Sequence, residues 1–189
     1  MNNTNIFFSV FVLCIFSLPL KADNLSSETD LRKEAVNIVK TFSGKLKPKL
    51  KEAIQTGGLD HAIKICSTVA PKIANNLSGE TGWGIRRVSL KPRNKSNAVP
   101  DAFERKVLNK FNHLQTKGEL FSSLEYSEMV DGKFRYMKAQ AVEGVCLGCH
   151  GNFISPDVKK LINEYYPEDI ATGYSLGEIR GAFSLVKDL

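Results

Sequence analysis

The sequence predicts a single α+β domain in which N-terminal helices flank an antiparallel sheet. Apolar residues recur at helical spacing up to about residue 80, whereas a turn dipeptide between two strand-like segments marks the C-terminal half. Helices and strands follow one another without strict alternation, which is typical of the α+β class. Without a leader peptide, the 189-residue chain is long enough for one hydrophobic core and too short for two ordinary domains.

An apolar stretch, Ile6–Leu20, lies near the N-terminus; it is short for a comfortable membrane span and suits the core of a signal peptide. We expect cleavage after Ala22, so that residues 1–22 are the signal peptide and residues 23–189 form the mature, periplasmic domain without a membrane span. Because residues 1–5 contain no Lys or Arg, an uncleaved anchor is the alternative.

Two helices are expected after the leader. Asp30–Gln55 has an apolar stripe at helical spacing, and Gly57-Gly58 should end it. Leu59–Leu77 repeats the pattern and turns Cys66 toward the interior. Pro71 falls inside this pattern, so the helix should bend just past Cys66.

The next segments are a strand, Thr81–Leu90, a loop over residues 91–100, and a third helix, Asp101–Thr116. The clearest strand signal then follows, because Asp131-Gly132 is a favoured pair for a type I′ hairpin turn between alternating segments.

This hairpin joins Ser122–Val130 to Lys133–Val142, and its register places Glu125 opposite Lys138 and Glu128 opposite Arg135. A short helix, Pro156–Glu164, and a last strand, Glu178–Leu185, complete the expected elements.

Cys146-Leu147-Gly148-Cys149-His150 has the spacing of a c-type haem attachment site. Each thiol can form a thioether with one haem vinyl group, and the adjacent imidazole is the proximal iron ligand. A zinc site needs a second ligand pair nearby, and none follows. A thioredoxin-like dithiol needs a strand before the motif and a helix that opens at it. The sequence therefore predicts one covalently attached haem c, with a redox dithiol as the alternative.

The second axial ligand has to come from upstream, because residues 151–189 contain no His, Met or Cys. Cys66 is the one cysteine left after the leader and the haem motif are accounted for. A lone thiol in an oxidising compartment is worth attention, although free cysteine also fills helix cores. An open site and a methionine ligand are the alternatives. The upstream candidates are Cys66, His61, His113, Met129 and Met137.

The segment Ala62–Ala74 resembles the helix that supplies a cysteine ligand in a family of exported, monohaem c-type proteins. Several other segments match this family in order: Gly82-Trp83, Ser89–Asn94, Arg135–Lys138, Cys146–Gly151, Tyr166–Tyr174 and Gly177–Ser184. The chain departs from the family pattern at Arg86-Arg87-Val88, where a Gly-Arg-Thr-like run is typical.

This family includes a photosynthetic lumenal haem protein, and similar domains are sensory regions of some histidine kinases. The resemblance implies a PAS-like α+β fold over nearly the whole mature chain. It also implies that His150 is the proximal ligand and Cys66 the distal ligand of the iron.

The full chain carries a net charge of +6, and no nucleic-acid motif accompanies this charge. Arg93, Arg135 and Arg180 are candidates to pair with the haem propionates, since guanidinium binds carboxylates in a bidentate manner. Lys91, Arg93 and Lys95 are a second kind of candidate, a docking face for an acidic redox partner.

A thiolate ligand favours ferric iron and predicts a low reduction potential. Loss of the sulfur ligand on reduction would couple a redox change, or NO or CO binding, to movement of the Cys66 helix. We therefore expect a redox or gas sensor that acts through a periplasmic signalling protein or redox partner. A low-potential periplasmic electron carrier is the alternative, and a haem enzyme is the least favoured class.

Overall fold

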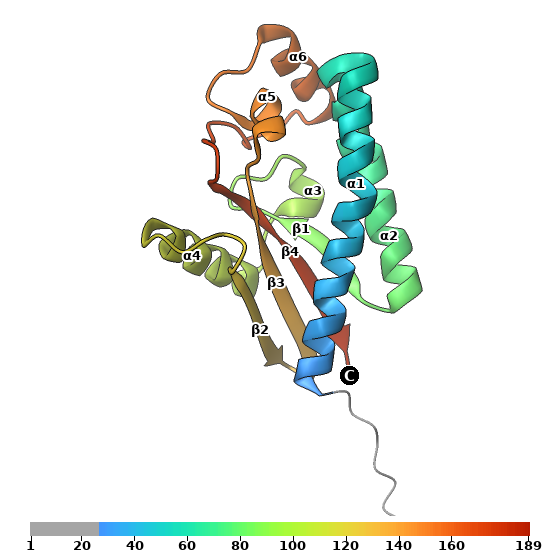
Figure 1. Ribbon diagram of the computed structural model, residues 1–189, viewed down its shortest axis with the longest axis vertical. Helices are drawn as coiled ribbons and strands as arrows, with labels where there is room; N and C mark the ends of the chain where they lie inside the picture. Colours follow the sequence, from blue (N-terminus) through green and yellow to red (C-terminus); the bar gives the residue numbers. More distant parts are fainter. Residues whose placement is uncertain (1–26) are drawn as a thin grey trace, which may run out of the picture.

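The computed structural model describes residues 27–189, so the expected signal peptide lies outside the described residues. Four strands form one sheet, and helices cover both of its faces (Figure 1). The elements in chain order are α1 (Glu28–Lys64), η1 (Ile65–Val69, a π-helical turn), α2 (Ala70–Thr81), β1 (Gly84–Val88), α3 (Lys95–Ala98), α4 (Ala102–Thr116), β2 (Glu125–Val130), β3 (Lys133–Ala141), η2 (Gly144–Cys146, a 3-10 turn), α5 (Leu147–His150), α6 (Pro156–Tyr165) and β4 (Ile179–Asp188).

The helical N-terminal half folds back on itself at the predicted glycine pair. Gly57 and Gly58 leave helical geometry, and Gly58 has a φ of 66°, a value that glycine adopts without strain. Figure 1 shows the long first part of α1 running along the molecule and α2 lying beside it. The predicted second helix, Leu59–Leu77, is interrupted. Its first residues, up to Lys64, form the end of α1, and η1 separates them from α2.

The sheet is antiparallel throughout, with strand order β1-β4-β3-β2. The predicted hairpin register is confirmed: Glu125 lies opposite Lys138 and Glu128 opposite Arg135. Asp131 and Gly132 both have positive φ, 51° and 74°, as a type I′ turn requires. The α+β class with an antiparallel sheet is therefore confirmed.

The two faces of the sheet pack against different helices. On one face, Phe134 and Tyr136 of β3 contact a core from α1 and α2, in which Phe42 meets Phe183 edge to face at 5.2 Å. On the other face, Met137 and its neighbours pack against α4. This alternation follows the period-two geometry of strands.

One predicted loop contains an additional short helix, since α3 lies within residues 91–100. The last strand extends to Asp188, three residues beyond the predicted end at Leu185. Within residues 27–189, no helix has both the length and the apolar character that a membrane crossing requires.

A buried carboxylate ties α4 to the sheet. Glu104 is 1% exposed and accepts hydrogen bonds from Arg86 Nη2 (2.7 Å) and the Asp101 backbone N–H (2.8 Å). Arg135 also pairs with it at 3.6 Å, and with Asp101 at 2.6 Å. Glu128 lies opposite Arg135 in the register but is not its ion-pair partner. Arg135 instead binds Asp101 and Glu104, at the start of α4.

We expect Glu104→Ala to lower the free energy of unfolding by about 3 kcal/mol, because it removes the buried carboxylate that accepts from Arg86 and from the Asp101 N–H. Urea denaturation followed by circular dichroism measures the change. Glu128→Ala is the control, since this exposed side chain accepts only from Tyr126 and its loss should cost under about 0.5 kcal/mol. Equal losses in the two variants would contradict the assignment.

Candidate haem site

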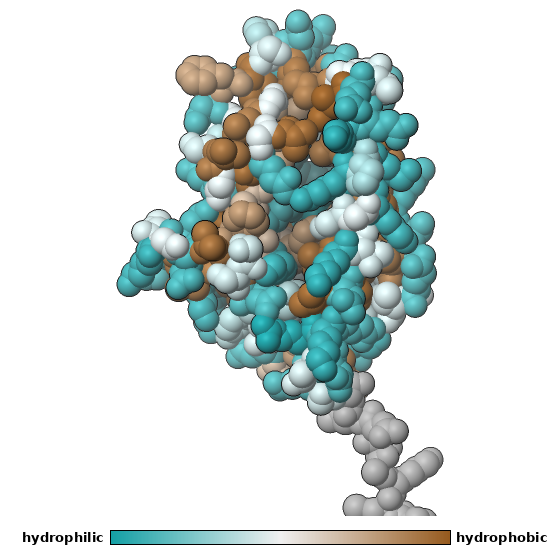
Figure 2. All heavy atoms as spheres, in the orientation of Figure 1, coloured by the Kyte–Doolittle hydropathy of each residue, from teal (hydrophilic) through white to brown (hydrophobic). Residues whose placement is uncertain are grey.

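A cavity of about 530 Å³ lies between the helices α1 and α2 and the end of the sheet where β3 leads into α5. This volume is typical of a cofactor pocket. Cys66, Cys146, Cys149 and His150 all line it, although Cys66 is far from the other three in sequence. Its apolar wall comes largely from α1: Phe42, Leu46, Leu50, Ile54, Leu59 and Ile63. In Figure 2, apolar side chains gather over the end of the molecule that holds α5 and α6.

The attachment motif forms one helical turn, with Cys146 in η2 and the remaining four residues in α5. At helical spacing, Cys149 and His150 lie three and four residues after Cys146 and therefore share its face. Gly151 follows because a Cβ there would lie 2.6 Å from the Leu147 carbonyl oxygen. Burial raises the pKa of both cysteine thiols, so both are protonated at neutral pH.

The imidazole of His150 is oriented by the backbone of a later segment. Its Nδ1 lies 2.6 Å from the Ala171 carbonyl oxygen, which fixes the proton on Nδ1 and leaves Nε2 as an acceptor. Arg180 Nε donates to this Nε2 at 3.1 Å. Burial, with help from the nearby Arg180 and Arg93, lowers the pKa of His150 to about 2. The side chain is therefore neutral, as a metal ligand must be.

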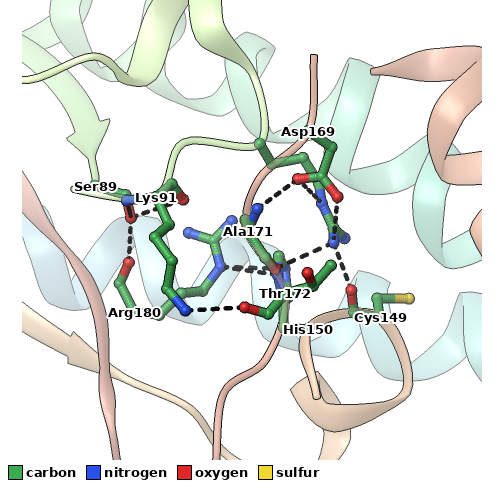
Figure 3. A network of polar contacts seen from close by, with 9 residues as sticks. Ser89, Lys91, Cys149, His150, Asp169, Ala171, Thr172 and Arg180 are labelled. Atoms are coloured by element: carbon green, nitrogen blue, oxygen red, sulfur yellow. Dashed lines mark hydrogen bonds and ion pairs between the residues drawn. The ribbon is translucent and has the colours of Figure 1, made fainter. Parts of the chain in front are cut away.

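The segment 169–174 holds the motif in place through a buried ion pair (Figure 3). Arg93 binds Asp169 through two contacts, Nε to Oδ1 and Nη2 to Oδ2, each 3.1 Å. The same guanidinium donates to the carbonyl oxygens of Cys149 and Ala171. Asp169 in turn accepts from the Ala171 N–H at 2.9 Å, so one salt bridge fixes both the motif and the carbonyl that orients the imidazole.

Backbone contacts complete this connection. The N–H groups of Gly173 and Tyr174 donate to the carbonyl oxygens of Gly151 and His150, each at 3.0 Å. Lys91 donates to the Thr172 carbonyl oxygen at 2.9 Å (Figure 3). Its ammonium group also lies over the Tyr174 ring.

Cys66 lies in the π-helical turn η1 and lines the same cavity as the motif. Pro71 explains why the helix changes pitch here, because its ring conflicts with the carbonyl of the residue four positions earlier and it has no N–H to donate. The hydroxyls of Ser67 and Thr68 both donate to the Lys64 carbonyl oxygen, at 3.1 and 2.7 Å. Such π-helical turns are frequent at functional sites.

The other upstream ligand candidates do not line the cavity. His61 lines a second, smaller cleft between α1 and η1. Met137 is buried against α4, and Met129 is exposed on the hairpin. His113 lies in the last turn of α4. Of the five candidates from the sequence, the structure brings only Cys66 to the cavity that His150 lines.

The three arginines expected to pair with the haem propionates do not all lie at the cavity. Arg93 and Arg180 line the cavity, but Arg135 does not, because its strand position faces α4 and its guanidinium binds Asp101 and Glu104. The expectation that Arg135 pairs with a propionate is therefore corrected.

Sequence reasoning missed Arg87, which lines the cavity and lies over the Phe42 ring at 5.5 Å. The period of two from buried Trp83 through Ile85 to Arg87 was a usable signal for this placement.

The predicted docking cations are engaged within the protein. Lys91 contacts Thr172 and Tyr174, and Arg93 is occupied by Asp169. Lys95 pairs with Glu168 at 2.7 Å. These three side chains therefore do not form a free basic face.

The site fits a haem better than a metal ion bound by protein alone. Among residues 27–189, no group of three or more His, Cys, Asp or Glu side chains is arranged to hold a metal ion. A porphyrin supplies four nitrogen ligands, so it needs only axial donors, apolar walls and partners for its two carboxylates. The cavity offers all three, and the fold and site thus define a haem-binding protein of the cytochrome type.

Comparison with known proteins gives the family. The family model described as Tll0287-like matches residues 22–187, so the chain belongs to the Tll0287-like family. The chain is also similar to the crystal structure of the cyanobacterial haem protein Tll0287, with a TM-score of 0.60 and 25% sequence identity. That match covers 80% of this chain and 93% of the other. No curated protein sequence matches the chain.

We expect Asp169→Ala to lower the free energy of unfolding by about 3 to 5 kcal/mol, because it leaves the buried Arg93 without its carboxylate. Glu168→Ala is the matched control: its pair with Lys95 is exposed, with side chains 61% and 56% accessible, and is worth under about 1 kcal/mol. Urea denaturation of both variants measures the difference. Similar losses would show that the Arg93–Asp169 pair does not hold the site together.

Proposed function

We propose that the protein is an exported c-type cytochrome with one haem, which serves as a redox or NO/CO sensor. Cys146 and Cys149 would carry the covalent attachment, His150 the proximal ligand and Cys66 the distal ligand. When bound, the haem supplies a one-electron couple and a position for a diatomic ligand. The observation that carries the proposal is that Cys66 lines the same cavity as the attachment motif, whereas the other upstream candidates do not.

His150 and Cys66 are held in place to different degrees, and this difference favours a sensor. His150 is tied by the Ala171 carbonyl and, through it, by the buried Arg93–Asp169 pair. Cys66 lies in a π-helical turn that contains no charged residue, and its Ser67 and Thr68 hydroxyls donate to the Lys64 carbonyl oxygen at its start. The cysteine side can therefore shift at lower cost than the histidine side.

A moving ligand suits signalling, because a local change becomes a change in the position of a helix. A carrier that exchanges electrons steadily needs the same ligands in both oxidation states. Low-potential electron transfer in the periplasm is the alternative function, and the internal contacts of Lys91, Arg93 and Lys95 count against a docking face built from them.

The remaining parts of the proposal concern place and partners. Export through residues 1–22 would bring the chain to the periplasm, where c-type haem is attached. The signal would pass to a periplasmic signalling protein or redox partner. We propose no catalytic role.

The ligand assignment predicts that Cys66→Ala loses the low-spin ferric thiolate signal of the wild type in low-temperature electron paramagnetic resonance. His61→Ala is the control, because His61 lies in the neighbouring cleft outside the cavity. Both proteins are made in a strain competent for cytochrome maturation. A wild-type signal that survives in Cys66→Ala would overturn cysteine ligation.

The sensor assignment predicts that reduction changes the ligand set and that the ferrous protein binds CO or NO. Absorption spectra of the ferric, ferrous and CO-treated protein measure both effects. A ferrous protein that keeps its ferric ligands and does not react with CO would favour the electron carrier instead.

A further inference from the structure

The cavity carries more positive than negative charge. One acidic residue, Glu143, lines it among the described residues, against five cationic side chains. These cationic residues are Lys47, Arg86, Arg87, Arg93 and Arg180.

Three of the five cations already have a carboxylate partner. Lys47 pairs with Glu143 at 2.5 Å across α1 and the segment before the motif. Arg86 pairs with Glu104 at 2.7 Å, and Arg93 pairs with Asp169 at 3.1 Å. Each of these pairs is complete without a bound group.

Arg87 and Arg180 differ from the other three, because neither has a carboxylate partner within residues 27–189. Arg87 is held by the Phe42 ring, and Arg180 donates to the His150 imidazole, which carries no charge. A guanidinium without a carboxylate partner beside a largely apolar cavity is costly, so both side chains favour a bound anion.

The backbone aims both side chains at the cavity. In β1, Arg87 projects toward α1 and Arg86 toward α4. In β4, Arg180 has no partner in the β3 register, because Gln140 lies opposite Gly181 and Ala141 opposite Ile179. A bulge of this kind redirects a side chain.

We infer that Arg87 and Arg180 bind the two propionate carboxylates of the haem, one guanidinium for each carboxylate, and that Arg93 does not take part. The inference rests on the proposed function, in which the haem occupies this cavity. Binding of iron at Nε2 of His150 would remove the acceptor that Arg180 uses in this structure, so Arg180 needs a new one. Arg93 has no such need, since Asp169 and two carbonyl oxygens occupy it.

The test compares the holoprotein with Arg87→Gln, Arg180→Gln and Arg86→Gln. Resonance Raman spectroscopy reports the propionate bending bands, and redox titration reports the midpoint potential. Loss of either partner should shift a propionate band and lower the potential, because a positive charge near the haem favours the reduced form. Arg86→Gln should leave the propionate bands as in the wild type, since its guanidinium already binds Glu104.

A conservative variant separates charge from contact. Arg87→Lys should keep a potential near that of the wild type while its propionate band shifts, because lysine retains the charge and lacks the bidentate fork. This variant also serves if Arg87→Gln does not accumulate.

Unchanged bands in both Arg87→Gln and Arg180→Gln would overturn the inference, as would a shift of the same size in Arg86→Gln. A shift in only one of the two would overturn the one-to-one pairing. A wild-type protein without a c-type haem spectrum would instead reject the proposed function itself.

Discussion

The buried ion pair between Arg93 and Asp169 is the interaction on which the rest of the site depends. It joins the loop after β1 to the segment after α6, and both of these segments hold the haem motif. A charge pair that is 9% and 3% exposed is stable only when its remaining donors and acceptors are satisfied. Here the carbonyl oxygens of Cys149 and Ala171 and the Ala171 N–H do this. The motif is thus fixed as part of a satisfied polar network.

The two faces of the sheet differ in the helices that cover them. Apolar residues of α1 and α2 close one face and provide the wall of the cavity, whereas α4 closes the other, with Glu104 in its first turn. Arginines of neighbouring positions therefore have different roles. Arg86 and Arg135 stabilise the α4 side, while Arg87 lies on the side of the proposed haem. The period of two along β1 directs the guanidinium groups of Arg86 and Arg87 to different helices.

Much of this arrangement is predictable from the sequence, because its signals are local. The Asp131-Gly132 turn and alternating residues determine the hairpin register, and Asp101 with Glu104 forms the capping box of α4. The attachment motif is defined by spacing alone. The rest depends on tertiary structure. Pro71 predicts a disturbance of the helix but not a π-helical turn, and the site of Arg135 depends on which helix covers its face.

The carbonyl that orients His150 comes from Ala171, and Arg93 reaches the motif from far upstream. The five-residue motif is contiguous, but the direction of its imidazole is a nonlocal property of the folded chain. Transplanting the pentapeptide into another scaffold would carry over its two thiols and its imidazole, but not the direction in which the imidazole points. The orientation of this ring is therefore a property of the whole domain rather than of the motif.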